Sequence, residues 1–333
     1  MKYICILPTS VNSDEFLKHI DSKKYKNLTT VEELKKIDYL EFVYFQLLNN
    51  EMKQILYKIK TKYSSNFLLK NPIQFKSELH HIVQKENPDF FDKYFLEQYD
   101  LSIDDASALK KLKKDALYIV KPTKSFHGKG NKVFKGTKNI YEYISQNNKK
   151  KFHKSRDGKN NKWVIQKYME NPMLLNGKKF HIRWNVLLAK EKVYMYKTGA
   201  VFPSALKYDS TNLDMKIHDT HGKSSLPEEH KGFPNDFFDK SFTKDIYKDI
   251  CNFIKEIKKM GLFDYECYKE TEECYGIIGI DFMINSDYQL KCIEINNMPG
   301  YTSGFPFTPH LIEGLLDITL YEKYKGKGYN EIY

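Results

Sequence analysis

The sequence has few features of a secreted or membrane protein. Its 333 residues contain no apolar run long enough to cross a bilayer. The apolar run in the opening MKYICILPTS is too short for a signal peptide. Five cysteines without a C-x-x-C pair argue against a disulfide framework and a zinc site, as expected in a reducing compartment. We therefore expect a soluble cytoplasmic protein without a membrane partner.

The chain also lacks the two common glycine-rich nucleotide fingerprints. The glycines of KPTKSFHGKG, residues 121–130, fit the start of the dinucleotide pattern, but Val133 stands where its third glycine belongs. Before the Gly-Lys-Ser of residues 222–224, Ile217 occupies the position at which a Walker A loop requires glycine. Any nucleotide site must therefore be of another kind.

Positive charge and aromatic side chains are abundant. Apolar residues make up 41% and aromatic residues 15%, which excludes a disordered chain and allows two or three subdomains. The net charge of +11 predicts an anionic partner, such as nucleotide phosphates, an acidic polypeptide, nucleic acid or a membrane surface. Nucleic-acid binding is not expected, because only residues 147–162 bring cations near aromatic rings, and a solvated basic loop explains them more simply.

The patterns along the chain divide it into three parts. These are a helix-rich N-terminal region at 1–75, a central part with the glycine-containing loop at 76–165, and a C-terminal part with most of the strands at 166–333. Apolar positions between residues 30 and 62 recur at mixed helical spacing, which predicts a packed helix pair there. Asn176-Gly177 is a hairpin-type turn signal.

Two apolar, strand-like runs near the C-terminus, residues 277–284 and 290–295, are interrupted by polar residues. Because alternate residues of a strand face opposite sides, Asp281 in one run and Glu294 and Asn296 in the other point away from the core. A short turn between the runs would place Asp281 opposite Glu294, and two facing like charges are destabilising unless a cation lies between them. Three oxygen donors suit Mg²⁺. A solvated sheet face is the alternative.

Strict alternation in KKFHIRWNVLL, residues 178–188, produces a second polar row. Lys179, His181, Arg183 and Asn185 share one face of the predicted strand, opposite an apolar face. The row is aimed at an anion or, as in many half-buried strands, at solvent.

The segment KPTKSFHGKG and the strand WVIQKYME, residues 163–170, would complete a nucleotide site. A lysine at a strand end followed by two glycines can place an ammonium and bare amide groups around phosphate. A Gln-Lys pair beside Tyr168 and Met169 suits an adenine slot, although core packing explains those two residues, taken singly, more simply. The order of these segments along the chain indicates one Mg·ATP site.

That order resembles the ATP-grasp fold and, within it, the tubulin tyrosine ligase-like family. The similar segments are 121–130, 164–188, 194–202, 210–212 and 279–300, within residues 116–305. The resemblance implies an α+β fold with the nucleotide site between two α+β subdomains, and ATP and Mg²⁺ as cofactors. The residues it implies are Asp281, Glu294 and Asn296 on Mg²⁺; Lys121, Lys167 and Lys179 on phosphate or nucleotide, with Gly128, Gly130 and His181 nearby; Gln166, Tyr168, Met169 and Met283 around adenine; and Arg183, Thr211 and Asn212 on substrate, with Arg183 and Lys121 as catalytic residues.

The chain departs from the family pattern at two positions. Where the family usually has K-F-D-x-R, His181 replaces the aspartate, and where it usually has G-x-x-R, Phe202 replaces the arginine. The first change should alter nucleotide contacts, and the second should alter how an anionic substrate is held.

The resemblance implies an ATP-dependent ligase that joins an amino acid (tyrosine, glutamate or glycine) to a protein or peptide carboxylate through an acyl-phosphate. The partners would be an acidic protein tail, for which tubulin is one candidate, and a free amino acid. Two alternatives stay open. One is a small-molecule ligase or a kinase of the same fold, and the other is a non-catalytic binder of RNA or acidic protein.

Overall fold

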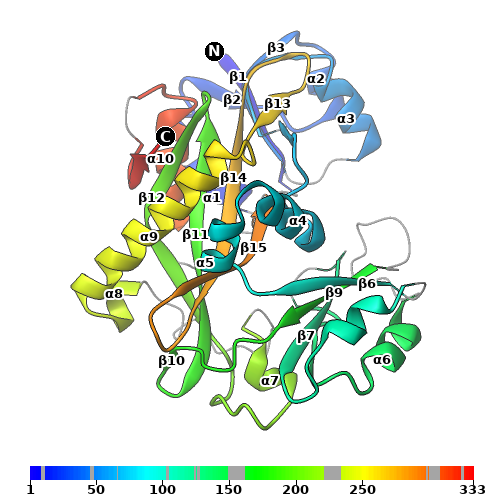
Figure 1. The fold of residues 1–333 in the computed structure, drawn as a ribbon. Helices are drawn as coiled ribbons and strands as arrows, with labels where there is room; N and C mark the ends of the chain where they lie inside the picture. Colours follow the sequence, from blue (N-terminus) through cyan, green and yellow to red (C-terminus); the bar gives the residue numbers. More distant parts are fainter. Residues whose placement is uncertain are drawn as a thin grey trace.

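In the computed structural model the described residues form three β-sheets, one of them a short two-stranded pair, with helices packed against the two larger ones (Figure 1). The described residues are 1–8, 12–45, 49–65, 67–102, 105–123, 125, 128–148, 162–220, 234–297, 299, 308–323 and 326–333. The predicted basic loop at 147–162 lies outside them except at its ends. No helix in these ranges is long and apolar enough to cross a membrane.

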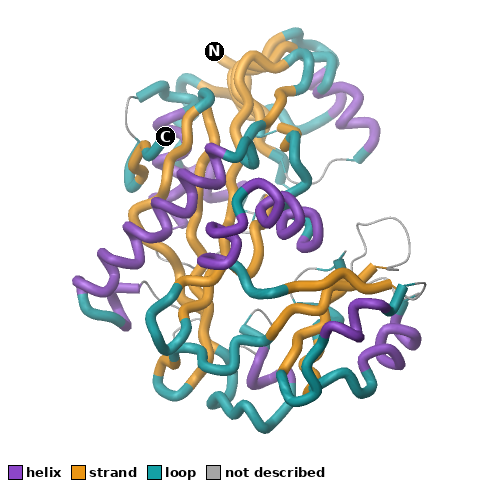
Figure 2. Tube along the Cα trace, in the orientation of Figure 1, coloured by secondary structure: helices purple, strands orange, loops and turns teal. Residues whose placement is uncertain are grey.

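The large sheet has ten strands and runs through the upper part of the molecule (Figure 2). Its order is β16 (Tyr329–Glu331), β12 (Lys192–Pro203), β11 (Lys178–Ala189), β14 (Thr271–Ile284), β4 (Lys60–Ser64), β3 (Tyr39–Tyr44), β1 (Lys2–Ile6) and β2 (Tyr25–Asn27), with β10 (Leu174–Leu175) beside β11 and β15 (Leu290–Asn297) beside β14. The long strand β14 unites the sheet, because it pairs in parallel with β4 near its start and antiparallel with β11 and β15 farther along.

Alternation along β11 and β14 divides the core between the two faces of this sheet. Trp184 and Ile280 belong to a cluster with helix α9 (Lys240–Lys259), which crosses the face toward the viewer in Figure 1. Leu187 and Tyr275 belong to a second cluster with helix α10 (Thr308–Ile318). Both faces are therefore covered by a helix.

The second sheet is smaller and antiparallel, with the order β6 (Gln98–Ser102), β9 (Lys162–Lys167), β7 (Leu117–Pro122) and β8 (Lys132–Lys135). Helix α6 (Ile140–Asn147) and the 3₁₀ turn η1 (Ser107–Lys111) pack on it around the buried Trp163. Helices α4 (Lys76–Glu86) and α5 (Pro88–Tyr94) lead into it from the upper part, and α7 (Met215–His218) lies beside β8 and β11.

The remaining elements complete the N-terminal part and the edges. They are α1 (Ser13–Lys18), α2 (Val31–Leu34), α3 (Asn50–Leu56), the two-stranded pair β5 (Phe67–Leu69) with β13 (Tyr265–Cys267), and α8 (Pro234–Phe237). The predicted hairpin turn at Asn176-Gly177 is confirmed, since both residues adopt positive φ between β10 and β11.

The structure confirms the α+β class and corrects two local expectations. The packed helix pair predicted between residues 30 and 62 is right only in part: the short helices α2 and α3 contact each other, but Tyr39–Tyr44 and Lys60–Ser64 are parallel strands, the first paired with β1 and the second paired with the first. A parallel strand covered on both faces has a near-continuous apolar run, which imitates helical spacing. The expected absence of disulfides is wrong, since Cys267 and Cys274 are joined across the β13–β14 connection.

The three parts predicted from the sequence do not correspond to separate sheets. Strands β1–β4, from the first part, continue the sheet that contains β11 and β14, from the third part. Strand β9 spans the boundary at 165/166. The boundaries at 75/76 and 165/166 stay a prediction.

Candidate functional site

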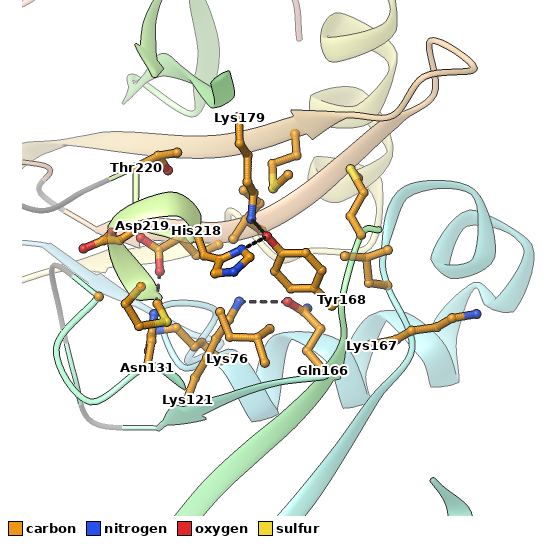
Figure 3. Close-up of a pocket in the computed structure, with 18 of the residues that line it drawn as sticks. Lys76, Lys121, Asn131, Gln166, Lys167, Tyr168, Lys179, His218, Asp219 and Thr220 are labelled. Atoms are coloured by element: carbon orange, nitrogen blue, oxygen red, sulfur yellow. Dashed lines mark hydrogen bonds and ion pairs between the residues drawn. The ribbon is translucent and has the colours of Figure 1, made fainter. Parts of the chain in front are cut away.

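A cavity of about 740 Å³, including space open to solvent, lies between the small sheet and the large one. Figure 3 shows the side chains around it. Nine residues predicted for the Mg·ATP site line it: Lys121, Gly128, Gln166, Lys167, Tyr168, Met169, Lys179, Met283 and Glu294.

The wall from the small sheet presents one buried polar pair. Lys121 on β7 donates from Nζ to Oε1 of Gln166 on β9 at 2.8 Å, and both side chains are buried. The neighbouring Lys167 contributes to the lining, but its exposed side chain points away from the cavity in Figure 3. Alternation along β9 explains the difference between these two adjacent residues.

Lys179 on β11 enters the cavity from the large sheet. Its Nζ donates to the hydroxyl of Tyr168 at 2.8 Å and lies 4.3 Å from the centre of the Tyr168 ring. The Tyr168 hydroxyl is also 2.7 Å from Nδ1 of His218 on α7. Residues from three separate segments therefore meet at one buried point.

Burial changes the ionisation of the two cavity lysines. Burial lowers the pKa of Lys179 to about 7 and that of Lys121 to about 8, with repulsion between neighbouring ammonium groups as a further cause. An anionic ligand favours the charged forms of both lysines, so its binding would raise their pKa values.

Gly128 belongs to the loop that closes the cavity near Asp219. It adopts a φ of +66°, and a β-carbon there would lie 3.1 Å from Oδ1 of Asp219. Gly130 also has positive φ, and its carbonyl accepts a hydrogen bond from Tyr143 at 3.0 Å. Gly130 does not line the cavity, so the two predicted glycines have different surroundings.

The predicted carboxylates Asp281 and Glu294 lie on adjacent strands in a row with Arg183, and of these three Glu294 is the one that lines the cavity. Asp281 is the register partner of Glu294 on β15 and of Arg183 on β11. Arg183 donates from Nε and Nη2 to the two oxygens of the fully buried Asp281, each at 2.7 Å. Asn296 donates to Asp281 at 3.2 Å and to Glu294 at 3.0 Å, and Nζ of Lys76 is 3.4 Å from Glu294.

This row fits a magnesium ion that shares its ligands with a nucleotide. Two carboxylates and one side-chain amide are hard oxygen donors, and Mg²⁺ commonly takes one or two carboxylates plus water and phosphate oxygens. The described residues contain no group of three or more His, Cys, Asp or Glu side chains that could hold a metal alone. Asp281, Glu294 and Asn296 would hold the ion.

The two residues that depart from the family pattern face each other. His181 on β11 is the register partner of Phe202 on β12, and their rings are stacked with centroids 4.7 Å apart and planes 3° apart. Nδ1 of the buried His181 is 2.6 Å from the hydroxyl of Thr220, and its Nε2 is 4.0 Å from Asp281. The Arg183 guanidinium is 5.8 Å from the Phe202 ring.

The polar row of β11 faces this site, so the solvent alternative for it is wrong. Lys179, His181 and Asn185 are each less than 5% exposed. Thr211 and Asn212, by contrast, have exposed side chains outside the cavity lining. The Asn212 carbonyl connects to the site through His218, whose Nε2 is 2.7 Å away.

Several lining residues were not predicted from the sequence. They include Lys76, Leu96, Ser125, Asn131, Met215, His218, Asp219, Thr220 and Ile293. Most come from segments without a motif, and Lys76 lies at the start of α4, far from the other residues in sequence. The sequence held one signal for His218 and Asp219. They follow the 210–212 segment closely, and a short helix there could bring them to the strand that carries Gln166 and Lys167.

Comparisons with known proteins agree with this geometry. The tubulin-tyrosine ligase family is matched over residues 48–327. The chain is 24% identical to tubulin glycylase 3B of Tetrahymena thermophila, over 61% of this chain and 18% of that protein. It is also 24% identical to a probable tubulin–tyrosine ligase of Schizosaccharomyces pombe, over 68% of this chain and 63% of that protein. The chain thus spans less than two thirds of these relatives.

A solved structure shows the same fold. The C-terminal domain of K. lactis Pby1, described as an ATP-grasp enzyme interacting with the mRNA decapping enzyme Dcp2, superposes with a TM-score of 0.67. The similarity covers 100% of this chain and 98% of that one at 17% sequence identity, so it establishes the ATP-grasp fold. Because the family pattern matches residues 48–327, which is most of the chain, the chain belongs to the tubulin-tyrosine ligase family.

Proposed function

We propose that the protein is an ATP-dependent carboxylate–amine ligase that adds an amino acid to a protein or peptide carboxylate through an acyl-phosphate. The observation that carries this proposal is the row of Arg183, Asp281 and Glu294, which reaches a cavity lined by buried lysines through Glu294. Family membership and the ATP-grasp fold support a ligase. A kinase would also need ATP in this cavity, but among the described residues no side chain of the site favours a hydroxyl acceptor.

Residues in different parts of the cavity are assigned to different parts of the nucleotide. Gln166, Tyr168, Met169 and Met283 form the part of the cavity suited to adenine, where polar edges and apolar faces lie together. Lys121 and Lys179 would bind phosphate oxygens from opposite walls. When bound, Mg²⁺ neutralises charge on the β- and γ-phosphate oxygens.

Arg183 stands where a transferred phosphoryl group and a substrate carboxylate would meet. It is 19% exposed at its side chain, and both of its hydrogen bonds to Asp281 are made from one side of the guanidinium. An arginine guanidinium has five N–H donors and can serve more than one acceptor. We assign the acyl-phosphate to Arg183, because a fixed cation stabilises the charge that develops there.

The acceptor in this proposal is an acidic protein tail. The names of the relatives are those of tubulin-modifying enzymes, which supports a tubulin tail as the first candidate. A net charge of +11 would speed association with such a tail at low salt. A cytoplasmic location, where this tail would be met, is part of the same proposal.

The His181–Phe202 stack alters the substrate side of this site. In the family pattern these facing positions carry an aspartate and an arginine, which would form an ion pair across the strands. Here a stacked histidine–phenylalanine pair replaces it, so the region beside Arg183 has one fixed cation and one carboxylate less, with stacked rings in their place. The choice of amino acid or acceptor is therefore expected to differ from that of relatives with the usual pair.

The activity assay compares the wild type with Glu294→Gln. Purified protein with ATP, Mg²⁺, an acidic tubulin-tail peptide and a mixture of amino acids should give a peptide with the added mass of an amino acid residue. Glu294→Gln removes one charge from the row and should lower the rate by on the order of 100-fold or more. The matched control is Glu266→Gln on β13, where the exposed carboxylate contacts Lys70. Equal rates in wild type and Glu294→Gln would contradict the proposal.

Nucleotide affinity should fall as the pH rises above 7.5. Burial places the pKa of Lys179 at about 7 and that of Lys121 at about 8 in the free protein, so both lose their protons in this range. Binding phosphate requires the ammonium forms, which costs about tenfold in affinity per pH unit for each deprotonated lysine. Calorimetry with a non-hydrolysable ATP analogue between pH 7.5 and 9.5 should show this loss together with proton uptake. Constant affinity without proton uptake would be the contrary result.

A double-mutant cycle tests whether His181 and Phe202 act as a pair. His181→Asp alone puts a carboxylate near Asp281, and Phe202→Arg alone puts a second guanidinium near Arg183. Each single variant should lower the free energy of unfolding in urea, whereas the double variant should recover about 0.5–3 kcal/mol relative to the sum of the two. Additive losses would mean that the two positions are independent.

A further inference from the structure

A chain of three hydrogen bonds, two of them buried and the third partly buried, connects the cavity to the segment that carries Asn212. Nζ of Lys179 is 2.8 Å from the Tyr168 hydroxyl, which is 2.7 Å from Nδ1 of His218. Nε2 of the same imidazole is 2.7 Å from the Asn212 carbonyl. Figure 3 shows Lys179, Tyr168 and His218 pointing toward one another, from β11, from the end of β9 and from α7.

The Asn212 carbonyl sets the direction of the bonds in this chain. A carbonyl can only accept, so Nε2 of the neutral His218 ring carries the proton and donates it to Asn212. Nδ1 of His218 then accepts from the Tyr168 hydroxyl, whose oxygen accepts from Lys179. A neutral Lys179 amine would weaken the chain, because an ammonium N–H is a stronger donor than an amine N–H.

The side chains of this hydrogen-bond chain are buried, so the direction of each bond affects its energy. Lys179, Tyr168 and His218 are each about 4% exposed, so water does not compete for their polar atoms as it does at the surface. Burial lowers the pKa of His218, which keeps the ring neutral; Asp209 and Asp214 on its own segment oppose this shift.

The segment at the far end is otherwise held by short local bonds. Asp209 accepts from the backbone of Thr211, and Asn212 accepts from the backbone of Asp214, while the intervening side chains are exposed. The His218 bond to the Asn212 carbonyl adds a connection that leads to the cavity.

We propose that Tyr168 and His218 are positioning residues that couple phosphate at Lys179 to the placement of the segment 209–214. The inference rests on the proposed function, since it requires a nucleotide in this cavity. Lys179 has three N–H donors and uses one on Tyr168, so the same ammonium can bind a phosphate oxygen and hold the chain. Bound phosphate keeps Lys179 charged and thereby fastens Asn212 beside the site where substrate is handled.

Hydrogen exchange of the backbone amides of residues 209–219 tests the coupling. In the wild type, saturation with a non-hydrolysable ATP analogue and Mg²⁺ should slow exchange in this segment by roughly fivefold or more, the lower end of typical coupling between sites. His218→Leu removes both polar atoms, and Tyr168→Phe removes the central hydroxyl. The affinity of each variant for the analogue is measured first, and exchange is compared at a concentration that saturates that variant; both should lose most of this nucleotide-dependent slowing.

Two further variants separate coupling from folding. His218→Gln keeps an acceptor and a donor on one side-chain amide and should retain the slowing. Tyr94→Phe removes the hydroxyl of another buried tyrosine. That hydroxyl donates to Asp249 at 2.6 Å, and neither residue lines the cavity, so this variant should behave like the wild type. If His218→Leu does not fold, Tyr168→Phe decides the result by the same readout.

The outcomes distinguish this inference from the proposed function. Analogue binding with full slowing in both His218→Leu and Tyr168→Phe would overturn the coupling and leave the ligase proposal intact. A wild type that binds the analogue without any slowing at 209–219 would do the same. A wild type that does not bind the analogue at all would overturn the proposed function and this inference together.

Discussion

The hydrogen-bonded ion pair between Arg183 and Asp281 is the interaction on which the site depends. Asp281 is completely buried and faces Glu294 across β14 and β15, so two negative charges share a low-dielectric setting. Without a cation, one of them would be forced to protonate or the strands would separate. Arg183 compensates Asp281, Lys76 approaches Glu294, and Asn296 donates to both carboxylates.

The strand β14 makes this arrangement geometrically possible. It is 14 residues long and is shared by the N-terminal parallel strands, by β11 and by β15. Because Arg183, Asp281 and Glu294 lie at matching positions of adjacent strands, their side chains project from the same face of the sheet. The opposite face is occupied by Trp184, Ile280 and the helix α9, which hold the strands in register.

A second set of buried cations gives the site its preference for anions. Lys121 and Lys179 approach from different sheets, and in the described part of the chain their polar partners are a glutamine and a tyrosine, not a carboxylate. Glu294 and Asp219 favour the charged forms of Lys121 and Lys179, but burial outweighs them, and a phosphate group would add further counter-charge. Buried cations of this kind reduce folding stability but increase the gain from binding, because an anionic ligand compensates for their burial.

Much of this could be predicted from alternation and turn chemistry. The pairing of Asp281 with Glu294 followed from the turn length between two alternating runs, and the shared face of Lys179 to Asn185 followed from strict period two. The direction of that face, toward a site instead of solvent, could not be known until the second sheet was placed. Lys76 and His218 could not be predicted, because long-range packing and not local pattern brings them to the cavity.

The errors have equally physical causes. Residues 39–44 combine aromatic and β-branched side chains that are buried on both faces of a parallel sheet, and such a run cannot be told from a buried helix by periodicity alone. Cys267 and Cys274 are seven positions apart, and only the path between β13 and β14 brings them together.

The most direct test of the account is the magnesium dependence of nucleotide binding. Calorimetry with a non-hydrolysable ATP analogue, with Mg²⁺ or with a chelator, compares the wild type, Asp281→Asn and the exposed control Asp287→Asn. We predict that Mg²⁺ tightens binding in the wild type and the control, and that Asp281→Asn loses about 10- to 100-fold of this effect. Equal binding with and without Mg²⁺, or an unchanged magnesium effect in Asp281→Asn, would contradict the assignment of the carboxylate row as the metal–nucleotide site.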